Sequence, residues 1–325
     1  MTATKVVAFG GGHGLSAALR ALRRCAPHLD LDITAVVTVA DDGGSSGRLR
    51  MERDSLPPGD LRQALVALAD DHPQTERSAE LFQYRFTAGR PDNGVADPLV
   101  GHAVGNLVLL GLFEQLGDPV AALEHAGAML GVTGRVLPMS CEPLCIEADV
   151  HGADPGQPDT VVTLRGQREV AATTGRVEAV RLTPSAPRAC AEAVAAVGAA
   201  DWLIFGPGSW FTSVIPHLLV PDLAAAIVSS PARRLVMLNL ASEKETLRLS
   251  VADHLAALRW YLPALAVHVV LADPTAVGDP GPVRRAAESL GARLVLAPVA
   301  AADGSPRHDC AALGAALVPV LRSDR

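Results

Sequence analysis

Short apolar runs alternate along the chain with segments whose apolar residues recur at helical spacing. The first run, Lys5–Phe9, is apolar and β-branched, and the glycine-rich stretch Gly10–Gly14 separates it from a helical pattern that begins at Leu15. A second run, Ile33–Val39, has no polar face, which is typical of a parallel strand buried on both sides. Strands that alternate with helices predict a parallel sheet with right-handed crossovers.

The same alternation extends along most of the chain. Further strands are predicted at Trp202–Phe205, Leu235–Leu240, His268–Leu271 and Leu294–Leu296. Helices are predicted at Leu15–Arg24, Leu61–Ala69, Gly105–Leu116, Ser213–Leu219, Val251–Tyr261, Val283–Leu290 and Ala311–Leu321. We therefore predict one α/β domain over residues 1–325, with a Rossmann-like parallel sheet flanked by helices.

The middle of the chain has a different pattern. Between about residues 132 and 182, turn residues separate short β-like pieces. These pieces are Gly134–Leu137, Ile146–Val150, Val161–Leu164 and Val177–Leu182. We interpret this stretch as antiparallel structure, either at a sheet edge or in a small β insertion.

Composition and charge narrow the classes of function. Hydrophobic residues make up 49% of the 325 residues, so a sizeable core is available and disorder is excluded as the main state. The formal net charge of −7 disfavours binding to nucleic acid or to an anionic membrane. Only Lys5 and Lys244 are lysines among the basic residues, a bias that we attribute to codon composition.

The chain has no sequence signal for a membrane or for secretion. Its apolar stretches are far shorter than the roughly 20 residues of a spanning helix, and its start lacks the pattern of a signal peptide. We therefore expect no membrane span and a cytoplasmic location. The five cysteines are scattered, and Cys141 and Cys145 have no second pair to complete a zinc site, so we favour ordinary thiols.

The glycine loop Gly10-Gly11-Gly12-His13-Gly14 lies where the first strand meets the first helix. Open α/β sheets bind ligands there, because glycines let backbone N–H groups approach an anion at a helix start. The spacing departs from the dinucleotide fingerprint, since Leu15 takes the last glycine position, and no Walker sequence is present. We predict contact with a phosphate; the alternative is a turn that only packs strand against helix.

A polar loop follows the second strand and reads Ala40-Asp41-Asp42-Gly43-Gly44-Ser45-Ser46-Gly47-Arg48. Asp41 or Asp42 is placed to bind ribose hydroxyls, or to bind Mg²⁺ together with a substrate phosphate. Adjacent side chains of an extended chain point apart, so chelation by both is not assured. Ser45 and Ser46 add small hydrogen-bonding groups. The alternative is a solvated turn.

A third loop, Gly206-Pro207-Gly208-Ser209, repeats the logic of the first one. It follows the strand Trp202–Phe205, and the hydroxyls of Ser209, Thr212 and Ser213 stand at the start of the next predicted helix. Two anion-binding turns on one sheet fit a ligand with two phosphates, or one with a phosphate and a sugar. This pairing predicts a nucleotide-type ligand.

The other candidates are single residues. We expect Asp60 to cap a helix after Pro57-Pro58-Gly59, while Arg62 could face the cleft. Asn106 lies at the start of an apolar helix, and its amide would either cap that helix or reach the ligand. We expect His102 to have a structural role rather than to act as a base. No triad, metalloprotease pair or nucleophile elbow is present, so we assign no catalytic residue.

Together these loops resemble the YvcK-like family, also called gluconeogenesis-factor-like or UPF0052, whose distant relatives are the CofD 2-phospho-L-lactate transferases. The resemblance runs from Phe9 to Pro221. It rests on FGGGHGLS, VVTVADDGGSSGRLR, PPGDLRQAL, GHAVGNL, GRVLPMS and IFGPGSWFTSVIPHLLVP. The last stretch is similar to the actinobacterial branch.

The resemblance implies a cytoplasmic regulator that binds a UDP-sugar, above all UDP-N-acetylglucosamine, and that is linked to cell shape, peptidoglycan synthesis and gluconeogenic growth. The two glycine loops would cradle the diphosphate, and Asp41 or Asp42 would hold ribose hydroxyls or a metal. Ser45, Ser46, Asn106 and Arg307 would complete the site. We also expect a homo-oligomer.

The family resemblance also implies a rival function and leaves the ligand open. The rival is a CofD-like transferase that uses a metal. The candidate metal is Mg²⁺, and its candidate ligands are Asp41 and Asp42. The chain departs from the family pattern at His13, where Thr is usual, and in the segment Ala241–Leu247, where only Glu245-Thr246 match. The ligand could therefore be a different nucleotide-sugar or a nicotinamide dinucleotide.

Overall fold

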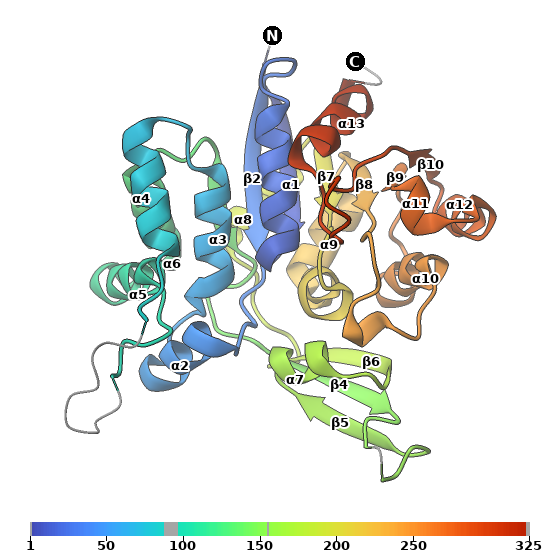
Figure 1. Ribbon diagram of the computed structural model, residues 1–325, viewed down its shortest axis with the longest axis horizontal. Coiled ribbons are helices and arrows are strands. Elements are labelled where there is room, and N and C mark those ends of the chain that lie inside the picture. The colour runs from blue at the N-terminus through green and yellow to red at the C-terminus, as the bar shows by residue number, and fades with distance from the viewer. Residues whose placement is uncertain (1, 88–96, 155, 323–325) are drawn as a thin grey trace.

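A seven-stranded sheet forms the centre of the molecule in a computed structural model that describes residues 2–87, 97–154 and 156–322 (Figure 1). Its strand order is β10-β9-β8-β7-β1-β2-β3, and every neighbouring pair is parallel. The strands are β1 Thr4–Gly10, β2 Leu31–Val37, β3 Arg135–Pro138, β7 Trp202–Phe205, β8 Arg233–Met237, β9 Val269–Ala272 and β10 Arg293–Leu296. The predicted parallel α/β sheet is confirmed.

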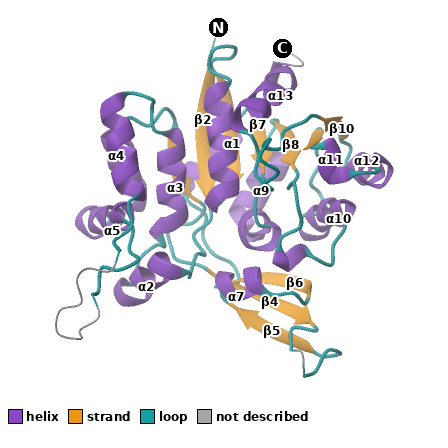
Figure 2. Cartoon of the chain, viewed as in Figure 1, coloured by secondary structure: helices purple, strands orange, loops and turns teal. Residues whose placement is uncertain are grey.

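Helices flank the sheet (Figure 2). They are α1 Gly12–Arg24, α2 Gly44–Arg53, α3 Pro58–Leu68, α4 Pro73–Gln83, α5 Val104–Leu116, α6 Pro119–Met129, α7 Gln167–Ala172, α8 Ala191–Gly198, α9 Pro221–Ser229, α10 Val251–Tyr261, α11 Pro274–Val277, α12 Pro280–Ser289 and α13 Cys310–Arg322, with short turns η1 Trp210–Val214, η2 Ile215–Leu219 and η3 Lys244–Thr246. Helix α1 packs between α3 and α13 on one face of the sheet, and α8 packs against α9 behind it.

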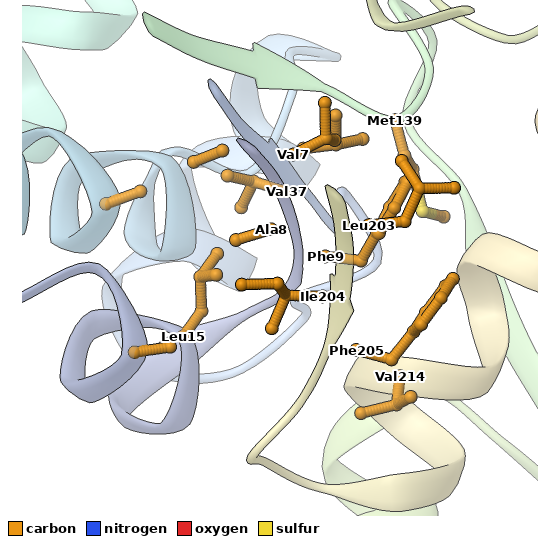
Figure 3. Close-up of a cluster of buried hydrophobic side chains, with 14 of the residues drawn as sticks. Val7, Ala8, Phe9, Leu15, Val37, Met139, Leu203, Ile204, Phe205 and Val214 are labelled. Carbon is orange, nitrogen blue, oxygen red and sulfur yellow. The ribbon is translucent and has the colours of Figure 1, made fainter. Parts of the chain in front are cut away.

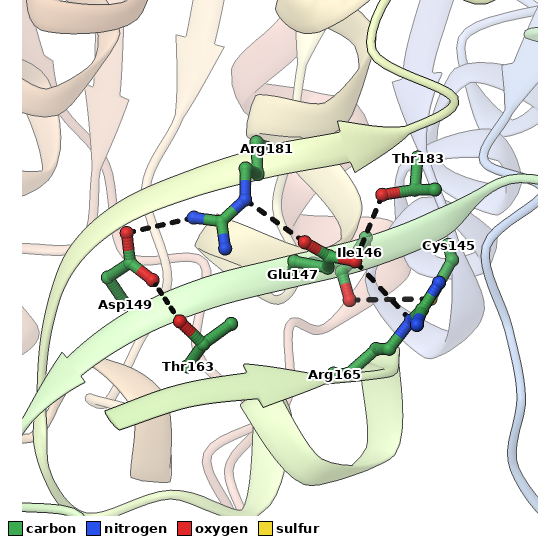
Figure 4. Close-up of polar contacts among 8 residues, drawn as sticks. All are labelled: Cys145, Ile146, Glu147, Asp149, Thr163, Arg165, Arg181 and Thr183. Atoms are coloured by element: carbon green, nitrogen blue, oxygen red, sulfur yellow. Dashed lines mark hydrogen bonds and ion pairs between the residues drawn. The ribbon is translucent and has the colours of Figure 1, made fainter. Parts of the chain in front are cut away.

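A small antiparallel sheet projects from the main body, in the order β5-β4-β6. Its strands are β4 Cys145–His151, β5 Val161–Arg165 and β6 Arg176–Thr183, and α7 connects the last two. On its exposed face Arg181 bridges Glu147 and Asp149, with distances of 3.0 and 2.8 Å (Figure 4). The predicted β insertion is confirmed, but it begins at β4.

The strand β3 was expected in the insertion and instead extends the main sheet beside β2. Three of its four residues are buried in succession, whereas buried and half-exposed residues alternate along β4. Continuous burial is typical of a parallel strand that is covered on both faces, whereas alternating burial is typical of a sheet with one face exposed to solvent. Four residues are too few for the sequence pattern to separate these two cases.

The core lies around the centre of the sheet, where β1 and β7 are neighbours (Figure 3). Phe9 of β1 stacks on Phe205 of β7 with ring centroids 4.9 Å apart, and both rings are fully buried. His217 packs edge-on against Phe9, and its Nε2 lies 3.0 Å from the carbonyl oxygen of Val36. This packing holds fixed the strand ends from which two of the predicted site loops emerge.

Two segments differ from their predicted form. The Gly/Ser-rich stretch expected as a loop folds into α2 from Gly44, and the helix expected at Ser213–Leu219 is instead the π-helical turn η1 followed by the 3₁₀ turn η2. Pro216 lacks an N–H group and lies in that second segment, which disfavours a regular α-helix.

A membrane-spanning helix was not expected, and among the described residues no single helix is long and apolar enough to cross a bilayer. One pair of helical segments, Trp210–Leu219 and Pro221–Ser229, passes the length and composition criteria together but is bent by 80°.

Candidate functional site

The crevice at the centre of the sheet arises from the order of its strands. The chain passes from β1 to β2 and β3 on one side, then returns to β7 on the other side of β1 and continues outward to β10. Ligands of open α/β sheets bind where the strand order reverses in this way, outside the carboxyl ends of the strands. The loops at 10–14 and 206–209 follow β1 and β7 and meet at this point.

The two glycine loops are in direct contact. A Cβ atom at Gly14 would overlap the carbonyl oxygen of Pro207 and would lie 2.6 Å from the Cα atom of Gly208. Only glycine lets the first turn of α1 approach the other loop so closely. Gly10 and Gly206 lie beneath the surface of the cleft, and the Gly206 N–H donates to the Phe9 carbonyl over 3.3 Å.

The first loop presents free backbone donors at a helix start. Gly11 is the N-cap of α1, and the first turn contains no acidic residue. The N–H of Gly12 donates to the Asp60 carboxylate, whereas the N–H groups of His13 and Gly14 have no hydrogen-bond partner in the part of the chain that the structure describes. Unpaired N–H groups and the positive end of the helix dipole favour an anion here.

In the second glycine loop, several hydrogen-bond donors already have acceptors within the protein. The Gly208 N–H donates to Asn239 Oδ1 over 2.8 Å, and the Phe211 N–H donates to Glu245 Oε1 over 2.9 Å. The Ser209 hydroxyl donates to Glu243 Oε2 over 2.7 Å. These donors are satisfied within the protein, whereas the N–H of Ser209, which lines the cleft, has no acceptor among the described residues.

Thr212 and Ser213 were predicted to add hydroxyls to the ligand site. Both are buried, and only Ser213 lines the cleft. Glu245, which lies below them, is 2% exposed, and burial raises its pKa to about 7.

The cleft has a volume of about 940 Å³ and is basic, in contrast to the acidic whole molecule. Five arginines line it: Arg20, Arg24, Arg62, Arg85 and Arg307. Among the described residues that line it, the acidic ones are Glu243 and Asp309. Fields of one sign are focused inside clefts, so this arrangement selects for an anionic ligand.

Arg307, which the family resemblance implied as a ligand contact, lines the cleft. Its side chain is 75% exposed and pairs with Asp303 at 2.9 Å, an exposed pair that stabilises little by itself. His308 also lines the cleft, and burial lowers the pKa of its imidazole. Arg307 can therefore turn toward a ligand at little cost, because only the weak ion pair with Asp303 has to break.

Asp41 and Asp60 form an acidic pair behind the first glycine loop. Asp41 Oδ1 accepts from the Gly43 N–H over 2.9 Å, and burial raises the pKa of this carboxyl group. Burial and the nearby Asp41 charge raise the pKa of Asp60 to about 7. Asp60 was expected to be an N-cap, but Pro57 occupies that position, and the Asp60 carboxylate reaches back to Gly12.

Asp42 was expected as a ribose or metal ligand and faces away from the cleft. Its Oδ1 accepts from the Arg168 N–H over 2.8 Å, at the start of α7. The carboxylate also occupies the space that a Cβ atom at Gly166 would need. Neighbouring side chains of an extended segment point to opposite sides, so Asp41 faces a second cavity beside the cleft and Asp42 faces the small sheet.

Ser45 and Asn106 lie beneath the cleft in a buried chain of hydrogen bonds. Ser45 Oγ lies 3.0 Å from His102 Nδ1 and accepts from Asn106 Nδ2 over 2.9 Å. Asn106 Oδ1 accepts from Arg62 Nε over 2.8 Å, and Arg62 also donates to Gln83. Asn106 is 1% exposed and does not cap its helix, which begins after Ala103. Its side chain instead contacts Ser45 and Arg62.

A second cavity of about 370 Å³ adjoins this hydrogen-bonded chain. Asp41, Ser45 and Ser46 line it, and Ser46 hydrogen-bonds the Asp41 carboxylate. Arg62 lines both cavities, as does Arg85, so the acidic pair and the basic cleft are joined through these guanidinium groups.

Several lining residues were missed by sequence reasoning. Arg20 and Arg24 follow His13 and Ala17 along α1 at helical spacing, so the face of the predicted helix that continues from the glycine loop could have identified them. Asn239 and Arg85 had no such signal, because each comes from a segment brought to the cleft only by tertiary packing.

Comparisons with known proteins identify the family of the chain. The family model described as 2-phospho-L-lactate transferase CofD matches residues 6–291. A Mycobacterium tuberculosis protein provisionally named gluconeogenesis factor is 50% identical over 323 residues, which cover 98% of this chain and 91% of the relative. The gluconeogenesis factor of Bacillus subtilis is 36% identical over 292 residues, covering 90% of this chain and 84% of that protein.

A solved structure shows the same architecture. A UPF0052 protein from Bacillus halodurans superimposes with a TM-score of 0.81 at 33% identity, covering 98% of this chain and 99% of that one. The family match includes both glycine loops and the acidic pair, while Arg307 lies beyond it. The chain therefore belongs to the CofD family, in the UPF0052 group of gluconeogenesis factors.

Proposed function

We propose that this protein binds a nucleotide-sugar, with UDP-N-acetylglucosamine as the first candidate, and regulates gluconeogenic growth, cell shape and peptidoglycan synthesis without turning the ligand over. One observation carries the proposal: the free N–H groups of His13 and Gly14 open onto the same cleft as five arginines. The names of the mycobacterial and Bacillus relatives support the link to gluconeogenesis.

The cleft suits a ligand with a diphosphate and two further groups. A phosphate at the start of α1 would accept from the free N–H groups, and Arg20 and Arg24 would extend the positive surface along the helix. The volume of about 940 Å³ lies in the upper part of the range of about 300–1,000 Å³ that is usual for ligand pockets. Base and sugar would therefore both find room beside the diphosphate.

Calorimetry with a panel of ligands tests the proposal: UDP-N-acetylglucosamine, UDP-glucose, UDP, UMP and NAD. We expect the diphosphates to bind and UMP to bind much more weakly, because the second phosphate adds charge-assisted hydrogen bonds. A panel in which no diphosphate binds would refute the proposal.

Helix α1 offers a matched pair of variants. Arg24 lines the cleft, whereas the neighbouring Arg23 is directed to Asp71, with which it pairs at 3.0 Å. Arg24→Gln should weaken UDP-sugar binding about tenfold or more, since a hydrogen bond to a charged group contributes about 1.5–3 kcal/mol. Arg23→Gln should leave the affinity unchanged. Equal losses of affinity in both variants would show that Arg24 does not contact the ligand specifically.

The acidic pair favours a second candidate, an Mg²⁺-dependent transferase of the CofD type. Mg²⁺ commonly binds one or two carboxylates together with substrate phosphates, and Asp41 and Asp60 supply two carboxylates whose mutual repulsion a cation would relieve. No group of three or more His, Cys, Asp or Glu side chains suited to a metal occurs within the described ranges. Asp41 and Asp60 fit such an ion better than the expected pair Asp41 and Asp42.

The two candidates differ in whether the diphosphate is cleaved. A bound Mg²⁺ would stabilise charge on a departing phosphate, while Asp41 and Asp60 would hold it and Arg62 would balance their charge. We expect UDP-N-acetylglucosamine with Mg²⁺ to give unchanged ³¹P NMR signals over hours. Product signals that vanish in Asp60→Asn but persist in Asp42→Asn would establish the transferase instead.

A further inference from the structure

A buried carboxylate joins the central sheet to a loop that forms one wall of the cleft. Asp273 follows β9 directly and is 3% exposed. Its Oδ1 accepts from the Thr275 N–H over 2.8 Å and thereby caps α11. Its Oδ2 accepts from the N–H groups of Val299 and Ala300 over 2.8 and 3.0 Å. These two residues begin the segment 299–309, which we call the rim loop.

The rim loop supplies part of the cleft wall and leads into α13 (Figure 1). The cleft is lined by its residues Ala301, Pro306, Arg307, His308 and Asp309. The whole loop lies beyond residues 6–291, which the CofD family model matches. This wall of the cleft is therefore a place where the ligand contacts can differ from those of other family members.

Bonds inside the rim loop give it a shape but do not place it at the cleft. The Ala301 N–H donates to the Arg307 carbonyl over 2.8 Å. The Arg307 guanidinium donates to Asp303 and Ser305 over 2.9 and 3.0 Å. All four residues belong to the loop, so these contacts move with it. The position of the loop depends on bonds that cross to the main body, and two of these meet at Asp273.

The base of the rim loop connects the buried carboxylate to Arg307. The Asp309 N–H donates to the Val299 carbonyl over 2.8 Å, and Ala300 pairs with His308 in an antiparallel bridge. Val299 is 1% exposed, so the base of the loop is packed as well as hydrogen-bonded. The residues that follow Arg307 are thus attached to the two residues that the carboxylate holds.

We propose that Asp273 is a positioning residue for ligand binding, which holds the rim loop so that Arg307 stands at the cleft. This inference rests on the nucleotide-sugar function proposed above. Arg307 would donate charge-assisted hydrogen bonds to a phosphate of the ligand. A ligand that uses Arg307 binds fully only to molecules whose loop is in place, so displacing the loop lowers the apparent affinity by the fraction displaced.

Asp279 provides a matched control at the start of the next helix. Both aspartates precede a proline, and the Oδ1 of each accepts from the N–H two residues later, over 2.8 Å at Asp273 and 2.9 Å at Asp279. Within the described ranges, Asp279 makes no hydrogen bond to the rim loop. Asparagine keeps one oxygen for the helix cap, but its NH₂ group cannot accept from Val299 and Ala300.

Calorimetry with UDP-N-acetylglucosamine compares these variants. We expect Asp273→Asn to weaken binding at least about fivefold and Asp279→Asn to leave it unchanged. In an Arg307→Gln background, Asp273→Asn should cost less than about twofold more, because the group that it positions is already gone. An equal loss in both backgrounds would overturn the proposal, as would wild-type affinity in Asp273→Asn.

Asp273→Ser is a second variant for the same cycle, should Asp273→Asn fail to fold. Serine keeps a capping oxygen for α11, but its side chain is too short to reach the rim loop. The expected loss of affinity and its dependence on Arg307 are the same as for Asp273→Asn.

Hydrogen exchange of the wild type, followed by NMR, tests the anchor without a variant or a ligand. Ala300 and Ala302 are both exposed, but the Ala300 N–H donates to Asp273, whereas no acceptor for the Ala302 N–H exists among the described residues. We expect the Ala300 amide to exchange at least about tenfold more slowly than the Ala302 amide. Equal rates would overturn the anchor. Should the wild type bind no diphosphate, the proposed function fails, and this comparison still decides whether Asp273 holds the loop.

Discussion

Neighbouring glycines of the first loop serve different physical needs. Gly14 is required by contact, since a side chain there would meet the backbone of Pro207 and Gly208. Gly12 is required by conformation, because its φ of +57° lies in the left-handed region, while the nearest atom to an added Cβ is Asp60 Oδ1 at 3.8 Å. The same residue type thus closes the floor of the cleft at one position and turns the chain at another.

The two positions should differ in the cost of an added methyl group. Gly12→Ala should lower the free energy of unfolding by about 1–2 kcal/mol through backbone strain alone. Gly14→Ala should cost about 1–3 kcal/mol and also separate the two loops, because overpacking displaces the backbone. Urea unfolding measures both losses. Nucleotide-sugar affinity should fall more in Gly14→Ala, and a normal affinity in that variant would contradict the importance of the loop contact.

Glu245 should impose a pH dependence on stability. Burial raises its pKa in the folded state to about 7, above the ordinary value of 4.5, so between these values unfolding releases a proton and stability falls as pH rises. The difference of about 2.5 pH units corresponds to about 3 kcal/mol. Glu245→Gln should remove this slope.

The measurement is urea unfolding of wild type and Glu245→Gln at several pH values from 4 to 8. The stability of wild type relative to the variant should decline across the window between about 4.5 and 7 and be constant outside it. Parallel curves for the two proteins would show that the carboxyl group titrates normally. Asp60 and His217 titrate in both proteins, so their effects cancel in the comparison.

At the scale of residues, the directions of the acidic side chains could not be predicted from the sequence. The pattern located the Asp41-Asp42 loop and left open which carboxylate faces the ligand site. The structure turns Asp41 inward and Asp42 toward α7, and it adds Asp60 from a different helix. A side chain's direction depends on backbone dihedrals and on neighbours distant in sequence, which no local pattern contains.

At the scale of elements, the signals in the sequence were strongest where apolar residues were dense. The strand Trp202–Phe205 and the helix Val251–Tyr261 were predicted with the bounds that the structure shows. Helix α2 was missed because Gly44 and its serine neighbours have low helix propensity, yet Ser45, Ser46 and Leu49 are buried and packing compensates. Strand β3 was assigned to the wrong sheet because pairing, unlike periodicity, is decided by distant residues.

Asp42 should act as a clamp between the main body and α7. Its removal in Asp42→Ala should cost about 1 kcal/mol, as the loss of an N-terminal helix contact does, and should speed amide hydrogen exchange in residues 167–172. Asp118→Ala is the matched control, since Asp118 accepts from Val120 N–H over 2.8 Å at the start of α6. It should lower stability similarly without changing exchange in α7. Equal exchange in both variants would show that α7 is held by other contacts.

At the scale of the whole molecule, a basic cleft lies in an acidic protein. A chain with a net charge of −7 repels anions at long range, while the five arginines attract them at close range. Long-range repulsion is screened by salt more strongly than contact inside a cleft. The two effects therefore act on different steps of binding.

We expect salt to separate association from dissociation. Raising the salt concentration from 0.02 to 0.2 M should increase the association rate of a UDP-sugar, because the long-range repulsion is screened, and should change the dissociation rate less, because contacts inside the cleft are screened less. Stopped-flow measurements at several salt concentrations provide both rates. An association rate that falls steeply with salt would instead show that the cleft dominates the field at a distance.

The pairing of β1 with β7 has a consequence for how the molecule folds. Val6 pairs with Trp202, so the cleft does not exist until two distant parts of the chain have docked. A ligand seated across this seam reports on the completed fold, and at one hundred times its dissociation constant it would stabilise the native state by about 2.7 kcal/mol. In the cell, ligand supply would then set the lifetime of the protein as well as its signalling state, since unliganded chains would open and be degraded sooner.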